Sequence, residues 1–192
     1  MIAEGFTNPT VTSFDMREYA GVFSPNVFVG GDAGGFGGGG WWSLDGVGQM
    51  THGTKWRWSR LEKEASASYH DGDVDANLLE LAALVMLTLN VGLIFPGACM
   101  EYAGDNVVSL AWATKMRSKN RTAAALIKAL AWDSVALGLR LVTSWTAGVD
   151  NTGPDCLSRW DEAERRATFA KLTEWQPVQV SDPDSTPFVL HS

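Results

Sequence analysis

The chain has 192 residues, a length that fits one domain with a substantial buried core. Hydrophobic residues make up 45% and charged residues 19%, the ordinary balance of a soluble globular protein. The net charge of −7 argues against an autonomous nucleic-acid binder, because phosphate contacts come from Lys and Arg, but it suits an enzyme that gathers carboxylates around metal.

No targeting or membrane segment is expected. Residues 1–20 lack a basic start followed by an apolar block, so no secretory signal is predicted. The longest apolar stretch, residues 78–95, is interrupted by Glu80, Thr88 and Asn90, which favours a buried helix and a turn over a membrane span. The two cysteines have neither metal-ligand spacing nor a disulfide framework. We therefore expect an intracellular protein, in the cytoplasm or nucleus, with no membrane partner.

The first third of the chain predicts three strands. Residues 1–25 have no sustained periodicity and form a lead-in segment. Residues 27–29 are β-branched and aromatic, as in a buried strand, and a glycine-dense turn is expected over residues 30–40. Residues 41–42 and 55–58 carry the tryptophans of two further strands. The three strands together predict an antiparallel meander.

Helices and strands alternate in the rest of the chain. The run of Leu, Ala, Val and Met over residues 77–90 predicts a buried helix. Asp105 and Asn106 can cap a later helix, and Gly138 can end another. The remaining expected elements are a strand over 98–103, helices over 105–117 and 122–137, a strand over 139–145 and a last helix from 152.

This order of elements predicts an α/β fold. Strands separated by helices pair in parallel and the opening meander pairs antiparallel, so a mixed five-stranded sheet flanked by helices is expected. The domain should span residues 26–174, and the proline-containing residues 175–192 should form a flexible tail. Trp112 and Trp132 lie on apolar helix faces and are expected in the core.

Four acids stand at the ends of predicted elements or inside apolar ones. Asp32 follows the first strand, Glu80 lies in the apolar helix, Asp105 follows the strand over 98–103, and Asp155 begins the last helix. A buried charge is costly unless it has a partner. Carboxylates that converge at strand ends can hold two Mg²⁺ ions about 4 Å apart, as metal-dependent phosphodiester hydrolases do.

Each acid also has a structural explanation. Asp32 could satisfy the backbone of a turn, and Asp105 and Asp155 stand where a helix cap or first-turn acid is favoured. Glu80 is the hardest to explain in this way, because leucines and alanines surround it. The residue pattern alone leaves both explanations open.

Four segments in the same order resemble a known family. They are residues 27–33 (Val-Phe-Val-Gly-Gly-Asp-Ala), 77–83 (Asn-Leu-Leu-Glu-Leu-Ala-Ala), 104–112 (Gly-Asp-Asn-Val-Val-Ser-Leu-Ala-Trp) and 148–159 (Gly-Val-Asp-Asn-Thr-Gly-Pro-Asp-Cys-Leu-Ser-Arg). These segments resemble the ribonuclease H domain of reverse transcriptases from retrotransposons, especially DIRS-like and related elements. The similarity runs from about residue 27 to residue 160.

The resemblance implies an RNase H-like fold and a metal site made of Asp32, Glu80, Asp105 and Asp155. It implies two Mg²⁺ ions, for which Mn²⁺ can substitute. Water then attacks an RNA phosphate and the 3′ oxygen departs. The implied substrate is an RNA–DNA hybrid, cut on its RNA strand during retroelement reverse transcription, and the implied partner is the polymerase domain of the reverse transcriptase.

The sequence departs from the family near its last motif. Trp145 stands where relatives often carry a His, and no His lies between Trp145 and Asp155. A non-catalytic RNase H-like module that positions nucleic acid therefore remains an alternative to the enzyme. A DNA nuclease on the same fold is a third possibility.

Six residues are candidates for contacting nucleic acid. The basic ones stand between two predicted helices, where a solvated helix end explains them equally well. Two asparagines belong to the family-like segments. The candidates are Asn106, Lys115, Arg117, Lys119, Arg121 and Asn151.

Overall fold

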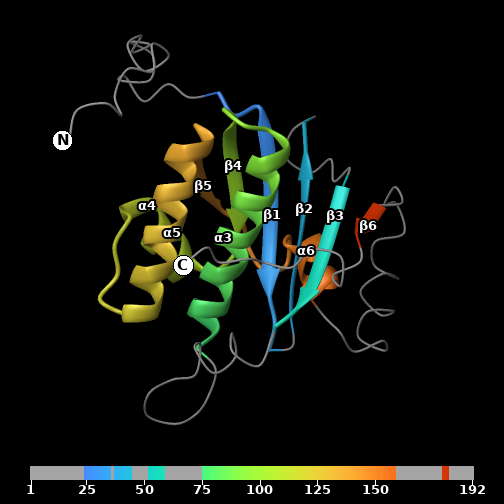
Figure 1. Cartoon of the computed structure of the whole chain (residues 1–192). Coiled ribbons are helices and arrows are strands. Elements are labelled where there is room, and N and C mark those ends of the chain that lie inside the picture. The colour runs from blue at the N-terminus through green and yellow to red at the C-terminus, as the bar shows by residue number, and fades with distance from the viewer. Residues whose placement is uncertain (1–23, 36, 45–51, 59–74, 159–178, 182–192) are drawn as a thin grey trace, which may run out of the picture.

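The computed structural model describes residues 24–35, 37–44, 52–58, 75–158 and 179–181. A six-stranded mixed sheet forms its centre, with the strand order β5-β4-β1-β2-β3-β6 (Figure 1). In chain order the strands are β1 (Val27–Ala33), β2 (Gly37–Ser43), β3 (His52–Arg57), β4 (Cys99–Gly104), β5 (Arg140–Trp145) and β6 (Gln179–Ser181).

The pairing of the strands confirms the predicted mixed sheet. β1, β2 and β3 form the expected antiparallel meander. β4 lies parallel to β1, and β5 lies parallel to β4. The sheet has one strand more than predicted, because β6 runs parallel to β3 over three residues. β6 falls within the expected flexible tail, and the other residues of that tail lie outside the described ranges, as do residues 1–23 of the lead-in.

Four helices complete the described structure: α3 (Ala76–Ile94), α4 (Val107–Lys115), α5 (Arg121–Leu137) and α6 (Thr152–Ser158). Asp75, Asn106 and Asn120 cap the first three with side-chain oxygens that accept from the first-turn N–H groups. Gly138 ends α5 in the left-handed conformation at φ 67°, as predicted.

The helices cover both faces of the sheet, as predicted. Successive residues of a strand point to opposite faces. In β2, a side chain at Gly40 would meet Leu87 of α3, whereas one at Gly39 would meet Leu157 of α6. Figure 1 agrees, with α3 and α5 in front of the sheet and α6 behind it.

The glycine-dense segment differs from the predicted turn. β1 extends to Ala33 and β2 starts at Gly37, so most of these glycines lie inside strands. The reason is tertiary packing, because large rings occupy the space that side chains would need. The ring of Trp41 lies over Gly30, and the ring of Trp56 lies over Gly38.

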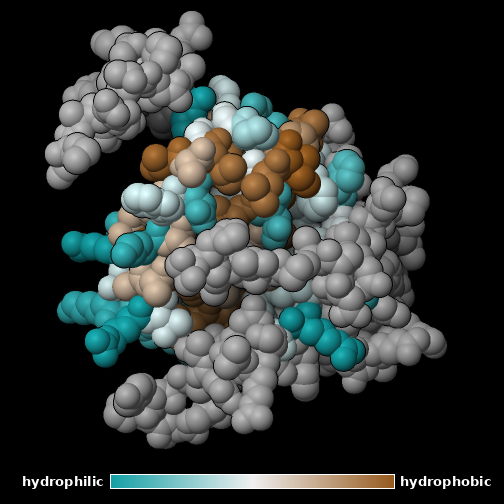
Figure 2. Space-filling model, viewed as in Figure 1, coloured by the Kyte–Doolittle hydropathy of each residue, from teal (hydrophilic) through white to brown (hydrophobic). Residues whose placement is uncertain are grey.

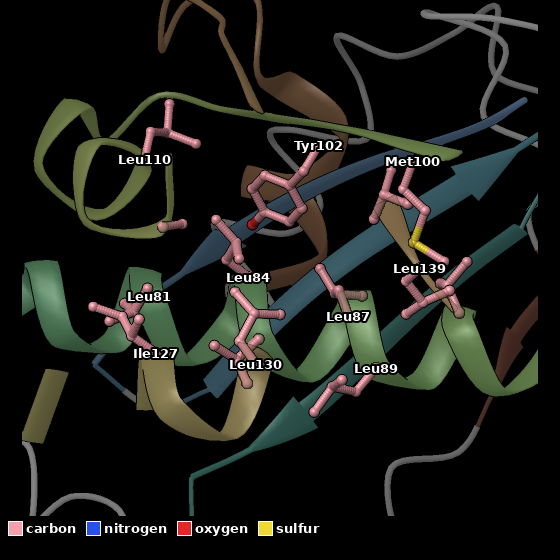
Figure 3. Close-up of a cluster of buried hydrophobic side chains, with 14 of the residues drawn as sticks. Leu81, Leu84, Leu87, Leu89, Met100, Tyr102, Leu110, Ile127, Leu130 and Leu139 are labelled. Carbon is pink, nitrogen blue, oxygen red and sulfur yellow. The ribbon is translucent and has the colours of Figure 1, made fainter. Parts of the chain in front are cut away.

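The main core lies between the sheet and α5, with α3 in the middle (Figure 3). Leu81, Leu84 and Leu87 of α3 are almost fully buried, and Met100 and Leu130 from β4 and α5 pack in the same cluster. Among the described residues, α3 is the one helix long and apolar enough to cross a membrane, but 67% of that stretch is buried inside the structure.

Trp132 corrects a prediction. It was expected in the core but is 77% exposed on α5, because the buried face of α5 is formed by other residues, Ile127 and Leu130 among them. Figure 2 shows apolar residues gathered at the end of the molecule where α3 and α5 finish. The large exposed apolar residues of these two helices are Leu93, Ile94, Trp132 and Val135.

Candidate metal centre

Three acidic side chains from different elements meet at one edge of the sheet. Asp32 lies near the end of β1, and Asp105 directly follows β4. Because β1 and β4 are parallel neighbours, their carboxyl ends lie together. Glu80 lies in the second turn of α3. One carboxylate oxygen from each residue lies within 4.8 Å of the other two.

Hydrogen bonds fix two of these carboxylates. The backbone N–H of Ala33 donates to Oε1 of Glu80 over 3.2 Å, which ties α3 to the end of β1. The hydroxyl of Ser158 in α6 donates to the carboxylate of Asp32. The two faces of the sheet are thereby linked through the acidic side chains.

Two of the three acids are largely withdrawn from water, and Asp105 is half-buried. Asp32 is 9% exposed and Glu80 is 8% exposed. Burial, and then the negative charge of Asp32, raises the pKa of Glu80 to about 9. Burial also raises the pKa values of Asp32 and Asp105, with a smaller contribution from neighbouring carboxylates. Uncharged or cation-bound carboxylates are therefore favoured here.

The donor set fits hard divalent cations. All three side chains offer carboxylate oxygen, and the described part of the cluster contains no His or Cys. Mg²⁺ and Mn²⁺ prefer oxygen ligands, whereas structural zinc sites use Cys and His. The acidic cluster is therefore suited to bind a divalent metal ion.

Asp155 lies beside this cluster. It is in the first turn of α6 and is not one of the three residues within 4.8 Å of one another. Its negative charge nevertheless contributes to raising the pKa values of both Asp32 and Asp105. The structure thus brings three of the predicted acids together and places the fourth near them.

The structure also shows that Asp105 is not the residue that caps α4. The residue that caps α4 is Asn106, whose Oδ1 accepts from the N–H groups of Val108 and Ser109 at 3.0 and 2.9 Å. The amide of Asn106 donates to Oδ1 of Asn77 at 3.1 Å. Both ends of this side chain are therefore engaged by the protein.

Asn151 is the second asparagine predicted to contact nucleic acid, and it is buried beside β1. It is 4% exposed, and its side-chain amide donates to the carbonyl of Gly31 over 3.4 Å. Gly31 precedes Asp32 in β1. Asn151 therefore holds the strand that carries Asp32, and its contact with nucleic acid stays a prediction.

The four basic candidates lie at and between the ends of two helices and are not part of the acidic cluster. Lys115 ends α4, Arg121 begins α5, and Arg117 and Lys119 lie between the two helices. All four side chains are exposed. Their exposure is compatible both with a solvated connection and with contact to a phosphate backbone.

Tyr102 is a site residue that the sequence did not predict. It lies in β4, three residues before Asp105, and is 2% exposed. Its hydroxyl has no hydrogen-bond partner within the described ranges and lies where a side chain at Gly31 would be. Burial, and then the charge of Glu80, raises the pKa of Tyr102. The residues that it meets, Gly31 and Glu80, are far from it in the sequence, so no local pattern indicated its place in the site.

Comparison with solved structures shows that the chain has the RNase H-like fold. The N-terminal RNase H domain of rv2228c from Mycobacterium tuberculosis superposes with a TM-score of 0.53 at 13% identity, covering 78% of this chain and 99% of that chain. LC11-RNase H1 superposes with a TM-score of 0.54 at 16% identity, covering 68% and 92%. No protein-family model matches the chain, and no curated protein sequence matches it. The predicted fold is thus confirmed.

Proposed function

We propose that this chain is a divalent-metal-dependent ribonuclease that cuts the RNA strand of RNA–DNA hybrids. The observation that carries the proposal is the meeting of Asp32, Glu80 and Asp105, from three separate elements, within 4.8 Å, with Asp32 and Glu80 largely buried. The fold supports it, because LC11-RNase H1 was solved in complex with an RNA/DNA hybrid. The order of the four acids along the chain supports it as well.

The four acids would hold two Mg²⁺ ions, with Mn²⁺ as a substitute. Asp32, Glu80 and Asp105 would supply the central ligands and Asp155 an outer one. Bound divalent ions supply positive charge that activates water and stabilises the departing oxygen of a phosphodiester. Hydrolysis with a departing 3′ oxygen leaves a 3′-hydroxyl and a 5′-phosphate on the cut RNA.

The protein's own groups prepare this site. The N–H of Ala33 holds Glu80, and the hydroxyl of Ser158 holds Asp32. The raised pKa of Glu80 means that this side chain keeps a proton at neutral pH until a cation takes the proton's place. Asn151 fixes β1 one residue before Asp32.

The exposed connection between α4 and α5 is the proposed contact for the sugar–phosphate backbone. Lys115, Arg117, Lys119 and Arg121 place four positive charges there in a chain of net charge −7. Such contacts position a nucleic acid without reading its sequence. Discrimination of the hybrid would come from its shape and the 2′-hydroxyls of its RNA strand.

The four family-like segments support a place in retroelement reverse transcription. On this proposal the chain acts inside the cell beside the polymerase domain of a reverse transcriptase. The motif order, and not the fold, carries this part of the proposal.

The test uses the full chain and a hybrid with a 5′-labelled RNA strand, in Mg²⁺ or Mn²⁺. Cleavage should need the metal, leave 3′-hydroxyl ends and fall at least about 100-fold in Asp32→Asn, since even outer-shell changes at metal sites cost about 10- to 100-fold. Asp133→Asn, which removes an acid on α5 outside the cluster, is the matched control and should cut normally.

Two other results would change the assignment. A folded chain that binds the hybrid without cutting it would be the non-catalytic positioning module. Equal cutting by Asp32→Asn would mean that the nuclease activity does not come from the acidic cluster.

A further inference from the structure

Trp145 is a large aromatic residue left exposed at the edge of the acidic cluster. It is the last residue of β5, and its backbone pairs with Gly104, the residue before Asp105. Its exposed fraction is 61%, although a tryptophan is usually mostly buried. The exposure of so large an apolar ring beside the acids therefore needs a functional explanation.

The indole is held in place by the backbone beside a proposed metal ligand. Its Nε1–H donates to the carbonyl oxygen of Asp105 over 3.1 Å. The next residue, Thr146, donates its N–H to the carbonyl of Gly104 over 2.9 Å. Because one edge of the ring is fixed and the residue is mostly exposed, the ring offers a pre-oriented apolar surface beside Asp105.

The loop that follows Trp145 stays close to the same acid. A side chain at Gly148 would lie 3.1 Å from Oδ2 of Asp105. The N–H groups of Asp150 and Asn151 both donate to the carbonyl of Ala147, which makes the loop a tight turn. A rigid turn keeps the exposed ring next to the acidic cluster.

We propose that Trp145 is a substrate-binding residue whose ring packs against a ribose of the RNA strand next to the bond that is cut. This inference rests on the proposed function. Bases in a hybrid are paired, whereas sugars and 2′-hydroxyls are displayed in the wide, shallow minor groove. An aromatic surface binds nucleic acid without phosphate contacts, which suits an acidic edge of an acidic chain.

Binding is measured apart from cleavage by fluorescence anisotropy of a labelled hybrid with Mg²⁺ in the Asp32→Asn background. Trp145→Ala should raise Kd about fivefold to tenfold. Trp145→Phe should raise Kd by less, because it keeps an aromatic ring but loses the Nε1–H bond that orients the ring beside Asp105. The matched control is Trp132→Ala, which removes another exposed tryptophan on α5 and should leave Kd unchanged.

In the cutting protein, Trp145→Ala should raise KM and leave kcat within about twofold, the pattern of lost substrate binding. A fall in kcat with unchanged Kd would overturn the proposal, because the indole would then act only by holding Asp105. Equal effects of Trp132→Ala and Trp145→Ala would also overturn it.

The outcomes separate this inference from the proposed function. A chain that cuts hybrids with a Trp145-independent KM keeps the nuclease and loses the inference. A chain that never cuts but binds hybrids through Trp145 loses the nuclease and keeps Trp145 only as a hybrid-binding residue. A chain that does not bind hybrids overturns both.

Discussion

Glu80 is a buried acid on α3, where its neighbours Leu79 and Leu81 are buried and apolar. A helix with a purely structural role would carry an apolar side chain at this position. Its pKa rises from the ordinary value of 4.5 to about 9, first through burial and then through the charge of Asp32. Between these two values the folded state binds a proton that the unfolded state does not. Stability of the metal-free protein must therefore fall as the pH rises through this window.

Thermal unfolding with a chelator present tests this linkage. The melting temperature should fall from about pH 5 to about pH 9, and Glu80→Gln should flatten the dependence because it removes the titrating group. Asp133→Asn, outside the cluster, should keep the wild-type slope. A melting temperature that rises across the same window would contradict the buried, proton-binding Glu80.

Asp105→Asn removes one of the crowded charges without changing the size of the side chain. The metal-free protein should gain about 1 kcal/mol, which is about 2–4 °C in melting temperature for a chain of this length, because carboxylates that repel one another cost stability. Hybrid cleavage should be lost at the same time. Unfolding scans and the cleavage assay measure the two effects. A variant that is less stable and still cuts would show that Asp105 has a structural role and is not a metal ligand.

Local context together with the resemblance of four segments to a known family singled out the acids, but nothing in the sequence indicated their supporting residues. Glu80 stands in an apolar helix where a charge is expensive, whereas Asp32 and Asp105 also had turn and capping explanations. Tyr102 and Trp145 belong to the site because of neighbours that are distant in the chain. The hydroxyl of Tyr102 lies against Gly31, and the indole N–H of Trp145 donates to the carbonyl of Asp105. No spacing rule brings such pairs together.

At the scale of elements, the close packing of α6 on the sheet depends on a glycine of β2. A side chain at Gly39 would meet the backbone carbonyl carbon of Leu157 and, at 2.6 Å, the backbone nitrogen of Ser158. A helix backbone cannot move aside as a flexible side chain can. α6 carries both Asp155 and Ser158, so its seat on the sheet also sets their places beside Asp32.

Gly39→Ala should therefore destabilise the protein by about 1–3 kcal/mol, the usual cost of overpacking, and lower cleavage by displacing α6. Chemical denaturation and the hybrid assay measure these changes. Gly35→Ala is the matched control, because nothing lies within 4 Å of a side chain there. Equal stability of the two variants would show that α6 is not seated on Gly39.

The connection between α4 and α5 has its own test. Replacing Arg117 and Lys119 by Gln should weaken hybrid binding and reduce the slope of log affinity against log salt by about 0.9 per lost phosphate contact. An unchanged slope would leave only a solvated connection. Asp32 and Glu80 are untouched, so kcat should be kept in the double variant.

The sequence predicted elements well where their residues show a clear periodicity, and poorly where tertiary packing determines the backbone conformation. The apolar run gave α3, and Asn106 and Gly138 marked a helix start and a helix end. The glycines of β1 and β2 were mistaken for a turn, because local propensity says nothing of the Trp41 and Trp56 rings that require them. Tertiary contacts override turn preference here.

At the scale of the whole molecule, the mixed sheet followed from the order of strands and helices. Parallel β1, β4 and β5 need helical crossovers, and the antiparallel β1, β2 and β3 need none. β6 could not be predicted, because a three-residue strand has no periodicity of its own. The topology places the ends of β1 and β4 together, which is why acids 73 positions apart in the sequence can share one metal site.

The most direct test of the central claim is strand choice. The full chain is incubated with Mg²⁺ and four duplexes: a hybrid labelled on its RNA strand, the same hybrid labelled on its DNA strand, duplex RNA and duplex DNA. We predict that only the RNA strand of the hybrid is cut. Cutting of duplex DNA at a comparable rate, or of the hybrid's DNA strand, would contradict the account and assign the acidic cluster to a DNA nuclease.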